Sequence, residues 1–568
     1  MRKEIVINVG LGETRAGTLE DGRLMEIYVE REDAERIVGN IYKGRVENVL
    51  PGMQAAFVDI GLERNAFLYV DDAVAYKNVQ RDLDEPLEHP KYKTIKDLLK
   101  PGQQIVVQVT KEPMGTKGAR VITHASLPGR YLVLMPTVEY IGISRRIVDE
   151  AERARLKAVA KSVKPKGMGL IVRTVAEGVS EVELAADCRF LVGMWETIQE
   201  QAKRTGAPAL LYKDHDLVYR LVRDMFSADV DKFVLDDLDE YRKTIDLLQT
   251  LAPHLKNHVF LYHGGPSIFD AYNIEQDLAA VMSRKVWLES GGYLVIDRTE
   301  ALTSIDVNTG RFVGSTNLAD TVLRTNLEAA AEIARQLRLR DLGGIIIIDF
   351  IDMDTVEDER RVIERLEEEL RRDKTKNHVL GFTGLGLVEM TRKKARQELS
   401  DILHKTCPYC EGKGRLLSEH TVASRVRREV FRRVKQYDFQ AILIEAHPSV
   451  AAVLIGPGGS NLRELEEVTR KTIYIRGRND LHMEAVEYAT GTRDEVAARA
   501  LPVHEGQIVA LEIAEQHASN PHDGIGRLEG YVIDIDGAGD KVGERHEVRI
   551  TQVHRTYAKA KLVSTAPQ

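Results

Sequence analysis

Four consecutive isoleucines, Ile345 to Ile348, constrain the fold of this chain more than any other feature. They follow a glycine pair and end at Asp349, and this pattern predicts a short strand that is buried on both faces. Thr355 is placed to cap a following helix. The apolar stripe of that helix consists of Val362, Ile363, Leu366 and Leu370. The pattern is helical from Leu217 to Thr250, and strands and helices then alternate up to about Leu403, so we expect a layered α/β core there.

Both sides of this core carry signs of further domains. Short strands with glycine punctuation in residues 37–121 predict a small barrel, which is interrupted at Asp71–Lys100 by a long loop with some helix. A helix is expected near Asp149–Val163. Residues 417–500 mix helices and strands, and residues 501–568 have the pattern of a second small barrel. We therefore expect a multidomain α/β protein.

The cysteine content indicates a reducing compartment. The chain has three cysteines, Cys188, Cys407 and Cys410, and a sparse, odd number does not suit a disulfide framework. The N-terminus lacks the apolar stretch of a signal peptide, and no run of about 18 apolar residues predicts a membrane span. We expect a cytoplasmic protein.

Basic residues are clustered, although the formal net charge is −8 and the pI is about 6.1. Acidic residues elsewhere can mask a basic groove in the net charge. Each cluster is therefore either part of such a groove or a solvated helix face. The clusters are Arg335, Arg338 and Arg340; Arg392, Lys393, Lys394 and Arg396; and Arg425, Arg427, Arg428, Arg432, Arg433 and Lys435.

Two aspartates far apart in the chain are candidate metal ligands. Strand alternation places Asp306 on one face with Ser304 and Asn308, where a carboxylate and an amide can bind a hard cation. Asp349 stands at the carboxyl end of the isoleucine strand, where open α/β sheets place ligands, and Asp352 is a nearby alternative. The spacing alone leaves two interpretations open: a shared metal site, or ordinary turn and capping residues.

This region resembles the ribonuclease E/G family, and the resemblance extends over roughly residues 1–500. It implies a ribonuclease H-like subdomain over residues 1–35 and 218–281, an OB-fold RNA-binding domain over 36–121, a 5′-sensor domain over 122–217 and a deoxyribonuclease-I-like catalytic subdomain over 282–403. The matching segments are Ile305-Asp-Val-Asn-Thr-Gly310, Thr325-Asn-Leu-Glu-Ala-Ala330, Glu332-Ile-Ala-Arg-Gln-Leu-Arg-Leu-Arg-Asp-Leu-Gly-Gly344, Ile348-Asp-Phe-Ile-Asp-Met353 and Gly386-Leu-Val-Glu-Met-Thr-Arg392.

The resemblance implies a magnesium-dependent endoribonuclease. Asp306 and Asp349 match the family's magnesium ligands, and Asn308 matches the polar partner beside them. A hard divalent ion prefers carboxylate and phosphate oxygens and makes a bound water more acidic. The implied reaction cleaves single-stranded RNA to 5′-phosphate and 3′-hydroxyl ends, in ribosomal RNA maturation or messenger turnover. The competing class is a non-catalytic RNA-binding protein that keeps the fold.

The first barrel carries candidate RNA contacts. Alternation predicts that Phe57 and Phe67 lie on its polar outer face, where aromatic rings suit stacking of bases. Both match the family's base-stacking positions, and the alternative is that they cover a neighbouring domain. The candidates for phosphate contacts are Lys43, Arg45, Lys111 and Lys117.

The segment Gly169–Thr174 is a candidate 5′-end sensor. The guanidinium fork of Arg173 fits a terminal monophosphate and Thr174 adds a hydroxyl, although such a pair alone is more often structural. The resemblance adds Gly129 and Val133 to the pocket. It also places Lys376 where the family often has arginine, which keeps the charge and loses the fork. Two more candidate RNA contacts are Arg145 and Arg146.

Residues 404–416 contain the pair Cys407-Pro-Tyr-Cys410. Structural zinc is held by four ligands, and one chain supplies two thiolates here, with His404 as a possible third ligand. A redox pair or a plain loop are the alternatives. The family resemblance implies a zinc link that is shared between two chains, and hence a homodimer or homotetramer.

Two C-terminal segments resemble RNA-binding modules. Gly456-Pro-Gly-Gly459 resembles the G-x-x-G loop of a KH-like domain, which we place at residues 417–500, although a simple turn before a helix has the same pattern. Residues 501–568 resemble a TRAM domain, a small RNA-binding barrel. The matching pieces are Asp523–Ile533 and Val548–Lys561.

Overall fold

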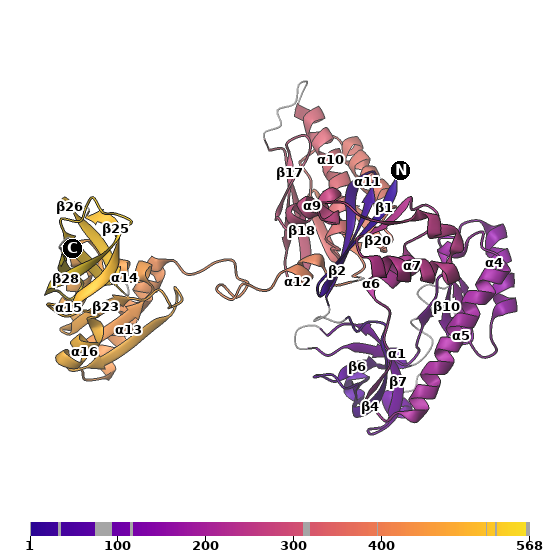
Figure 1. The fold of residues 1–568 in the computed structure, drawn as a ribbon, viewed down its shortest axis with the longest axis horizontal. Coiled ribbons are helices and arrows are strands. Elements are labelled where there is room, and N and C mark those ends of the chain that lie inside the picture. Colours follow the sequence, from indigo (N-terminus) through magenta and orange to yellow (C-terminus); the bar gives the residue numbers. More distant parts are fainter. Residues whose placement is uncertain are drawn as a thin grey trace. The chain divides into compact units, whose positions relative to one another are not determined.

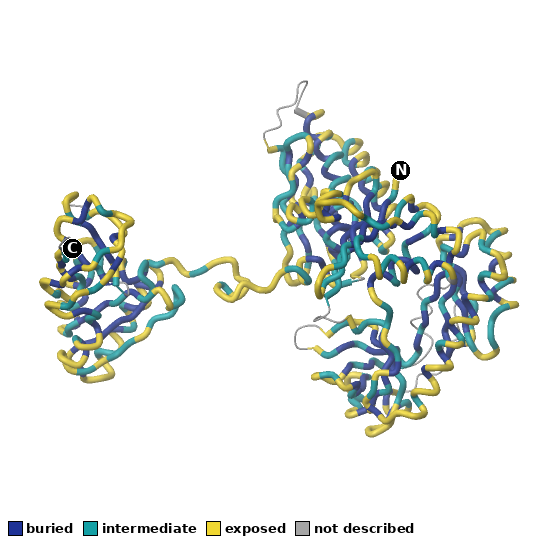
Figure 2. The backbone as a smooth tube through the Cα atoms, viewed as in Figure 1, coloured by how far each residue is buried: buried dark blue, intermediate teal, exposed yellow. Residues whose placement is uncertain are grey.

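The computed structural model describes residues 2–31, 36–73, 94–113, 117–310, 318–394, 396–517, 520–528 and 531–563. The chain divides into two compact units, Met1–His404 and Lys405–Gln568 (Figure 1). Buried residues concentrate inside each unit, whereas the segment that joins them is mostly exposed (Figure 2). Among the described residues, no helix is long and apolar enough to cross a membrane.

The first sheet joins the start of the chain to a distant segment. Its strand order is β15-β14-β1-β2-β3, and β1 pairs in parallel with β14. Alternate residues of β1 enter separate cores, Ile5 and Ile7 on one side and Val6 on the other. Its strands are β1 (Lys3–Gly10), β2 (Glu13–Glu20), β3 (Arg23–Arg31), β14 (Lys232–Leu235) and β15 (Val259–Leu261). The helices beside it are α6 (Leu217–Asp224), α7 (Leu238–Leu251), α8 (Ile268–Ala271) and α9 (Ile274–Val281).

The second sheet closes into the expected small barrel, because β4 pairs with both β5 and β7. A strand from outside residues 37–121, β13 (Ala209–Tyr212), also joins it by pairing with β4. The interrupting segment begins and ends with the short helices α1 (Val70–Ala73) and α3 (Ile95–Leu98), and residues 74–93 lie outside the described ranges. The barrel strands are β4 (Ile41–Leu50), β5 (Ala55–Asp59), β6 (Ala66–Tyr69), β7 (Gln104–Lys111) and β8 (Arg120–Ile122).

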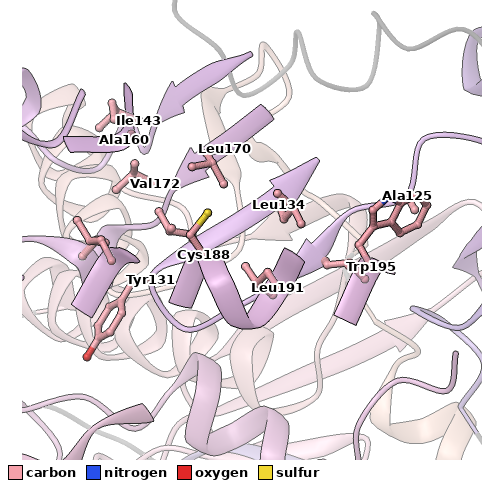
Figure 3. Packing of buried hydrophobic residues seen from close by; sticks show 14 of the residues in the cluster. Ala125, Tyr131, Leu134, Ile143, Ala160, Leu170, Val172, Cys188, Leu191 and Trp195 are labelled. Atoms are coloured by element: carbon pink, nitrogen blue, oxygen red, sulfur yellow. The ribbon is translucent and has the colours of Figure 1, made fainter. Parts of the chain in front are cut away.

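A four-stranded sheet packs against two helices. The expected helix is confirmed as α4 (Glu150–Val163), with the Asp149 side chain accepting a hydrogen bond at its N-terminus. The longer helix α5 (Glu181–Arg204) buries Cys188, Leu191 and Trp195 against the strands (Figure 3). The strands are β9 (Leu127–Pro128), β10 (Leu132–Met135), β11 (Ile141–Ile143) and β12 (Gly169–Val172), in the order β11-β12-β10-β9.

The isoleucine strand lies in a six-stranded sheet, here called the central sheet. Its order is β16-β17-β18-β19-β21-β20, and β18 and β19 are its parallel pair. Thr355 caps α11 as expected, by accepting from the backbone N–H of Asp358. The strands are β16 (Lys285–Trp287), β17 (Tyr293–Arg298), β18 (Leu302–Asn308), β19 (Gly344–Asp349), β20 (Asn377–Phe382) and β21 (Leu387–Arg392), and the helices are α10 (Leu318–Leu339), α11 (Val356–Leu370) and α12 (Leu399–Leu403).

The prediction that the isoleucine strand is buried on both faces is wrong. Ile346 and Ile348 are fully buried under α10 and α11, but Ile345 is 51% exposed and Asp349 is exposed. The two helices cover one face of the central sheet, so the alternate residues of β19 project from the other, exposed face. We call this second face the open face of the central sheet.

In two of the three basic clusters, the arginines bind carboxylates or carbonyls of the first unit. For these arginines, both interpretations, a solvated helix face and an RNA groove, are therefore wrong. The guanidinium of Arg392 lies between Asp341 and Asp373, at 2.8 and 2.6 Å. Arg338 pairs with Glu20 and Glu26 of the first sheet. The Arg338 pairs hold α10 against the N-terminal strands, whereas the Arg392 pairs lie within the region of the central sheet. The remaining arginines are also engaged: Arg335 with Glu332, Arg340 with the carbonyl of Ser283, and Arg396 with Asp341.

The second unit contains a three-stranded sheet and a closed five-stranded barrel. The third basic cluster lies on α13 (Glu419–Gln436), where Arg432 and Arg433 pair with Glu429. Gly456–Gly459 connects two helices, with positive φ at Gly456, Gly458 and Gly459. The other elements are β22 (Ala441–Ala446), α14 (Pro448–Ile455), α15 (Ser460–Thr469), β23 (Thr472–Gly477), β24 (Val486–Gly491) and α16 (Arg493–Ala500), and the barrel strands are β25 (Ile508–His517), β26 (Asn520–Leu528), β27 (Tyr531–Asp536), β28 (Arg545–Val553) and β29 (Tyr557–Leu562).

Candidate active site

The structure brings Asp306 and Asp349 together. They are direct partners in the parallel register of β18 and β19, which places their Cα atoms about 4.8 Å apart, the spacing of neighbouring strands. Both side chains are exposed on the open face of the central sheet, while Ile305 and Ile348 beside them are buried. Two carboxylates that are 43 positions apart in sequence therefore meet at the ends of adjacent strands.

Asn308 completes this pair. Its Nδ2 donates to Oδ2 of Asp306 at 2.7 Å, so the amide orients that carboxylate. Partial burial raises the pKa of Asp349, and the negative charges of Asp306 and Asp352 raise it further. A cation would relieve the repulsion that raises this pKa. The donor set is thus two carboxylates and the amide that orients one of them.

The turn after Asp349 is held by a buried side chain. Asn326 of α10 is fully buried, and its amide binds both the carbonyl and the N–H of Ile351, at 2.8 and 3.1 Å. This contact fixes the backbone that follows Asp349. The sequence placed Asn326 in a family motif without assigning it a role, because its partner is 25 residues away.

This donor set suits magnesium rather than a closed protein cage. Among the described residues, no group of three or more His, Cys, Asp or Glu side chains is arranged to hold a metal ion. Magnesium keeps several waters and is usually bound by one or two carboxylates together with substrate phosphates. Asp306 and Asp349 meet that requirement, since they leave the solvent side open.

The barrel places Phe57 and Phe67 as expected on its outer face. They are register partners on β5 and β6, and their ring centroids lie 5.8 Å apart at an interplanar angle of 70°. Both are half-buried, whereas Ala56, Val58 and Leu68 are fully buried inside the barrel. Two adjacent ring surfaces thus remain accessible on a polar face.

Of the four basic candidates on the barrel, Arg45, Lys111 and Lys117 are exposed and Lys43 is partly buried. Lys111 is the last residue of β7. Lys117 precedes Gly118, which lies so close to Asn65 that a Cβ there would be 2.1 Å from the Asn65 carbonyl oxygen. Lys43 and Arg45 also make contacts within the protein. Lys43 donates to the carbonyls of Ala202 and Thr205 at the end of α5, and Arg45 donates to the carbonyl of Ala207.

The candidate sensor residues also meet. Arg173 donates from Nη1 to the carbonyl of Gly129 at 2.7 Å, and the Thr174 hydroxyl lies 2.8 Å from that of Ser144. Arg145 directly follows Ser144. A Cβ at Gly129 would lie 2.7 Å from the Asp187 carboxylate, which accepts the backbone N–H groups of the same loop, so the loop requires glycine there.

Two further contacts define this sensor region. Arg173 pairs with Asp224 at 2.7 Å, and Asp224 also pairs with Arg223 at 2.8 Å. Burial alone would raise the pKa of Asp224, but the two arginines hold it below its usual value. Arg146 donates to the carbonyl of Lys374, two residues before the exposed Lys376, and Val133 lies on β10 opposite Ile171. No sequence pattern pointed to Asp224, because its contact with Arg173 depends on the packing of α6.

The cysteine pair lies in a turn of the second unit. The backbone N–H groups of Cys410 and Tyr409 bond to the Cys407 sulfur and lower the pKa of its thiol. Nε2 of His482 lies 2.6 Å from the carbonyl oxygen of Tyr409, and the centroids of the His482 and Tyr409 rings are 4.2 Å apart. Cys407 is exposed and Cys410 is partly exposed. The turn therefore leaves both thiols accessible, and the pKa of Cys407 is the lowered one.

Comparisons with known proteins show which family the chain resembles. The model described as Ribonuclease E/G family matches residues 126–395, and the TRAM domain model matches residues 502–563. Ribonuclease G of Escherichia coli (strain K12) is 44% identical over 479 residues, which cover 84% of this chain and 97% of the relative.

Two other relatives extend this similarity. Ribonuclease G of Haemophilus influenzae is 42% identical over 474 residues, which cover 83% of this chain and 96% of the relative. Ribonuclease E of Nostoc sp. is 45% identical over 412 residues, which cover 72% of this chain and 57% of the relative. The resemblance drawn from the sequence is confirmed, and this chain belongs to the Ribonuclease E/G family.

Proposed function

We propose that this protein is a magnesium-dependent endoribonuclease that cleaves single-stranded RNA to 5′-phosphate and 3′-hydroxyl ends and is stimulated by a 5′-monophosphate. Family membership makes the chain an endoribonuclease, a hydrolase that acts on RNA. The observation that carries the finer proposal is the direct pairing of Asp306 with Asp349 on the open face of the central sheet. Its proposed roles are RNA processing and decay, including ribosomal RNA maturation and messenger turnover.

In this proposal Asp306 and Asp349 hold the ion and Asn308 keeps the Asp306 carboxylate in position. Bound magnesium would offset the charge that builds on the scissile phosphate and make a water more acidic. The exposed carboxylates leave room for an RNA phosphate beside them. We assign residues 282–403 to a deoxyribonuclease-I-like catalytic subdomain and residues 1–35 with 218–281 to a ribonuclease H-like subdomain.

We assign the RNA-binding path to the barrels and the sensor region. Phe57 and Phe67 would stack on bases of an OB-fold-bound strand, with Lys111 and Lys117 near its phosphates. Residues 417–500 and 501–568 would add the KH-like and TRAM-like modules. The sensor contacts are proposed at Gly129, Val133, Arg145, Arg146, Arg173, Thr174 and Lys376.

A comparison of two RNAs that differ only at the 5′ end tests this function. We expect the 5′-monophosphorylated, A/U-rich RNA to be cleaved roughly 10- to 100-fold faster than its 5′-hydroxyl twin, since Arg173 and Thr174 can form charge-assisted bonds to the phosphate. EDTA should stop cleavage of both. Mapping of product ends by sequencing should show 5′-phosphates and 3′-hydroxyls.

The Arg173→Gln variant is the matched test of the sensor. It should lower cleavage of the phosphorylated RNA to the rate of the hydroxyl RNA and leave the latter unchanged. The fold should survive, because Arg223 still pairs with Asp224. Full 5′-phosphate stimulation in this variant would remove Arg173 from the sensor.

We also propose a zinc ion shared by Cys407 and Cys410 of two chains, within a homodimer or homotetramer. This assignment requires reduced thiols and therefore fits a cytoplasmic location. The purified protein should contain about half a zinc ion per chain, because four thiolates are needed for one ion. Metal analysis and light scattering should show that Cys407→Ser loses both zinc and assembly, whereas Cys188→Ala keeps both. One full zinc ion per chain would contradict the shared site.

A further inference from the structure

Two aromatic side chains share the open face with Asp306 and Asp349. The register pairs Trp287 of β16 with Tyr293 of β17, and Tyr293 with Asn308 of β18. Residues directly opposite one another in neighbouring strands project from the same face of a sheet. Trp287, Tyr293 and Asn308 therefore form a row from the edge of the central sheet to Asp306, the carboxylate to which Asn308 donates.

The two aromatic side chains of this row are accessible to solvent. Trp287 is 63% exposed and Tyr293 is half-buried, whereas Val286 and Leu294, on the other face of the same strands, pack into the core. The two rings are 5.4 Å apart at an interplanar angle of 62°. Packing of the sheet does not account for the aromatic pair, since its core lies under the opposite face.

A lysine adds positive charge to the same surface. Nζ of Lys285 lies 3.9 Å from the centre of the Trp287 ring and 3.5 Å from that of Tyr293. In the part of the chain that the structure describes, no carboxylate pairs with this ammonium group. Ring faces beside an ammonium group are the combination that binds the bases and phosphates of single-stranded nucleic acid.

We propose that Lys285, Trp287 and Tyr293 form a nucleotide subsite that takes a base of the RNA strand close to the cleaved phosphate. Trp287 would stack on the base, and Lys285 would move from the rings to a neighbouring phosphate. The exchange is favourable, because a base–aromatic stack is worth more than an exposed cation–π contact. Trp287 lies two strand spacings, roughly 10 Å, from β18. The base that stacks on Trp287 would therefore belong to a nucleotide close, along the RNA strand, to the one bound at Asp306.

This inference rests on the proposed catalytic role of Asp306 and Asp349. RNA is the favoured occupant over a protein chain for two reasons. The row ends at Asn308, which contacts Asp306, and Lys285 beside the rings is positively charged, as binding of a phosphate requires. A protein partner on this surface would instead leave cleavage of RNA by the isolated enzyme independent of Trp287.

Steady-state cleavage of a short single-stranded RNA provides the first test. Trp287→Ala should lower kcat/KM about 5- to 150-fold, the range that corresponds to one lost base stack, and Trp287→Phe should retain most of it. Leu380→Ala is the matched control, since Leu380 is 61% exposed on the opposite edge strand, β20. Equal kcat/KM values for Trp287→Ala and Leu380→Ala would overturn the subsite.

Tryptophan fluorescence gives a second readout that needs no cleavage. The chain has two tryptophans, and Trp195 is 5% exposed in the core beside α5. RNA added in EDTA should quench the wild-type fluorescence, and this quenching should disappear in Trp287→Phe, where Trp195 alone remains. Fluorescence that does not change at saturating RNA would also overturn the proposal.

The two readouts separate this inference from the function on which it rests. If the catalytic assignment is wrong, Asp306→Asn and Asp349→Asn still cleave RNA, whatever Trp287 does. If the subsite alone is wrong, those variants are inactive while Trp287→Ala behaves like Leu380→Ala and the fluorescence is unchanged.

Discussion

The Asp306→Asn and Asp349→Asn variants are expected to cleave single-stranded RNA at least about 10³-fold more slowly than the wild type, with unchanged affinity for RNA. Each variant replaces one of two carboxylates that lie side by side on β18 and β19. Loss of either carboxylate weakens binding of the ion that offsets the charge on the phosphate. That ion would lower the reaction barrier by several kcal/mol. Single-turnover cleavage and fluorescence anisotropy measure the two quantities separately.

Both variants should remain folded. The pKa of Asp349 is raised by partial burial and by repulsion from Asp306 and Asp352, so the ionised carboxylate opposes folding slightly. A neutral asparagine removes that repulsion, and the thermal midpoint should therefore not fall. A loss of activity accompanied by a loss of structure would not fit this explanation.

Asp297→Asn is the matched control for these variants. Asp297 lies on β17, opposite Ser304 on the same open face. It forms an ion pair with Arg284 and is not a neighbour of Asp306 in the strand register. It should cleave RNA at the wild-type rate, because its carboxylate is not at the proposed ion. Substantial cleavage by both Asp306→Asn and Asp349→Asn would refute the assignment. An inactive wild type that still binds RNA would favour the non-catalytic class of protein.

The second large effect concerns stability. Arg392→Ala should lower the free energy of unfolding of the first unit by about 3–5 kcal/mol, because it leaves Asp373 as a buried charge without its partner and takes one of two arginine partners from Asp341. The Arg392 side chain is 2% exposed and also donates to the carbonyl of Leu342. Burial alone would lower the pKa of Arg392, but the carboxylates of Asp373 and Asp341 raise it above its usual value.

Chemical denaturation, followed by circular dichroism, measures this change. Lys393→Ala is the neighbouring control, since Lys393 is exposed, and its effect should stay within about 0.5 kcal/mol. Arg392→Lys should fall between the two, because lysine keeps the charge but cannot form the fork of bonds to both aspartates. A similar stability for Arg392→Ala and Lys393→Ala would show that the buried ion pairs contribute little.

Local patterns predicted much of the architecture. Period-two alternation placed Asp306 with Asn308 on one face and set Phe57 and Phe67 on the outside of the barrel, as the structure has them. Capping chemistry located the start of α11 at Thr355. These features depend on residues within a few positions of one another, which is why the sequence is sufficient for them.

Long-range partners were not predictable. The sequence suggested that Arg392 and Lys43 are surface groups. In the structure, Arg392 bridges two buried aspartates, and Lys43 donates to a carbonyl at the end of a helix some 160 positions away. Trp287 and Tyr293 gave no signal either, because their relation to Asp306 exists only through the register of three strands. The burial of β19 on one face depended on which side α10 and α11 cover.

By itself, the sequence determined the family, the strand and helix periodicities, and which carboxylates were candidates for a metal. The tertiary structure alone decided that Asp306 and Asp349 are neighbours and that Trp287 lies in a row with Tyr293 and Asn308 on the same face. The physical reason is that periodicity arises within one strand or helix, whereas register and the covered face of a sheet arise from pairing and packing between distant segments.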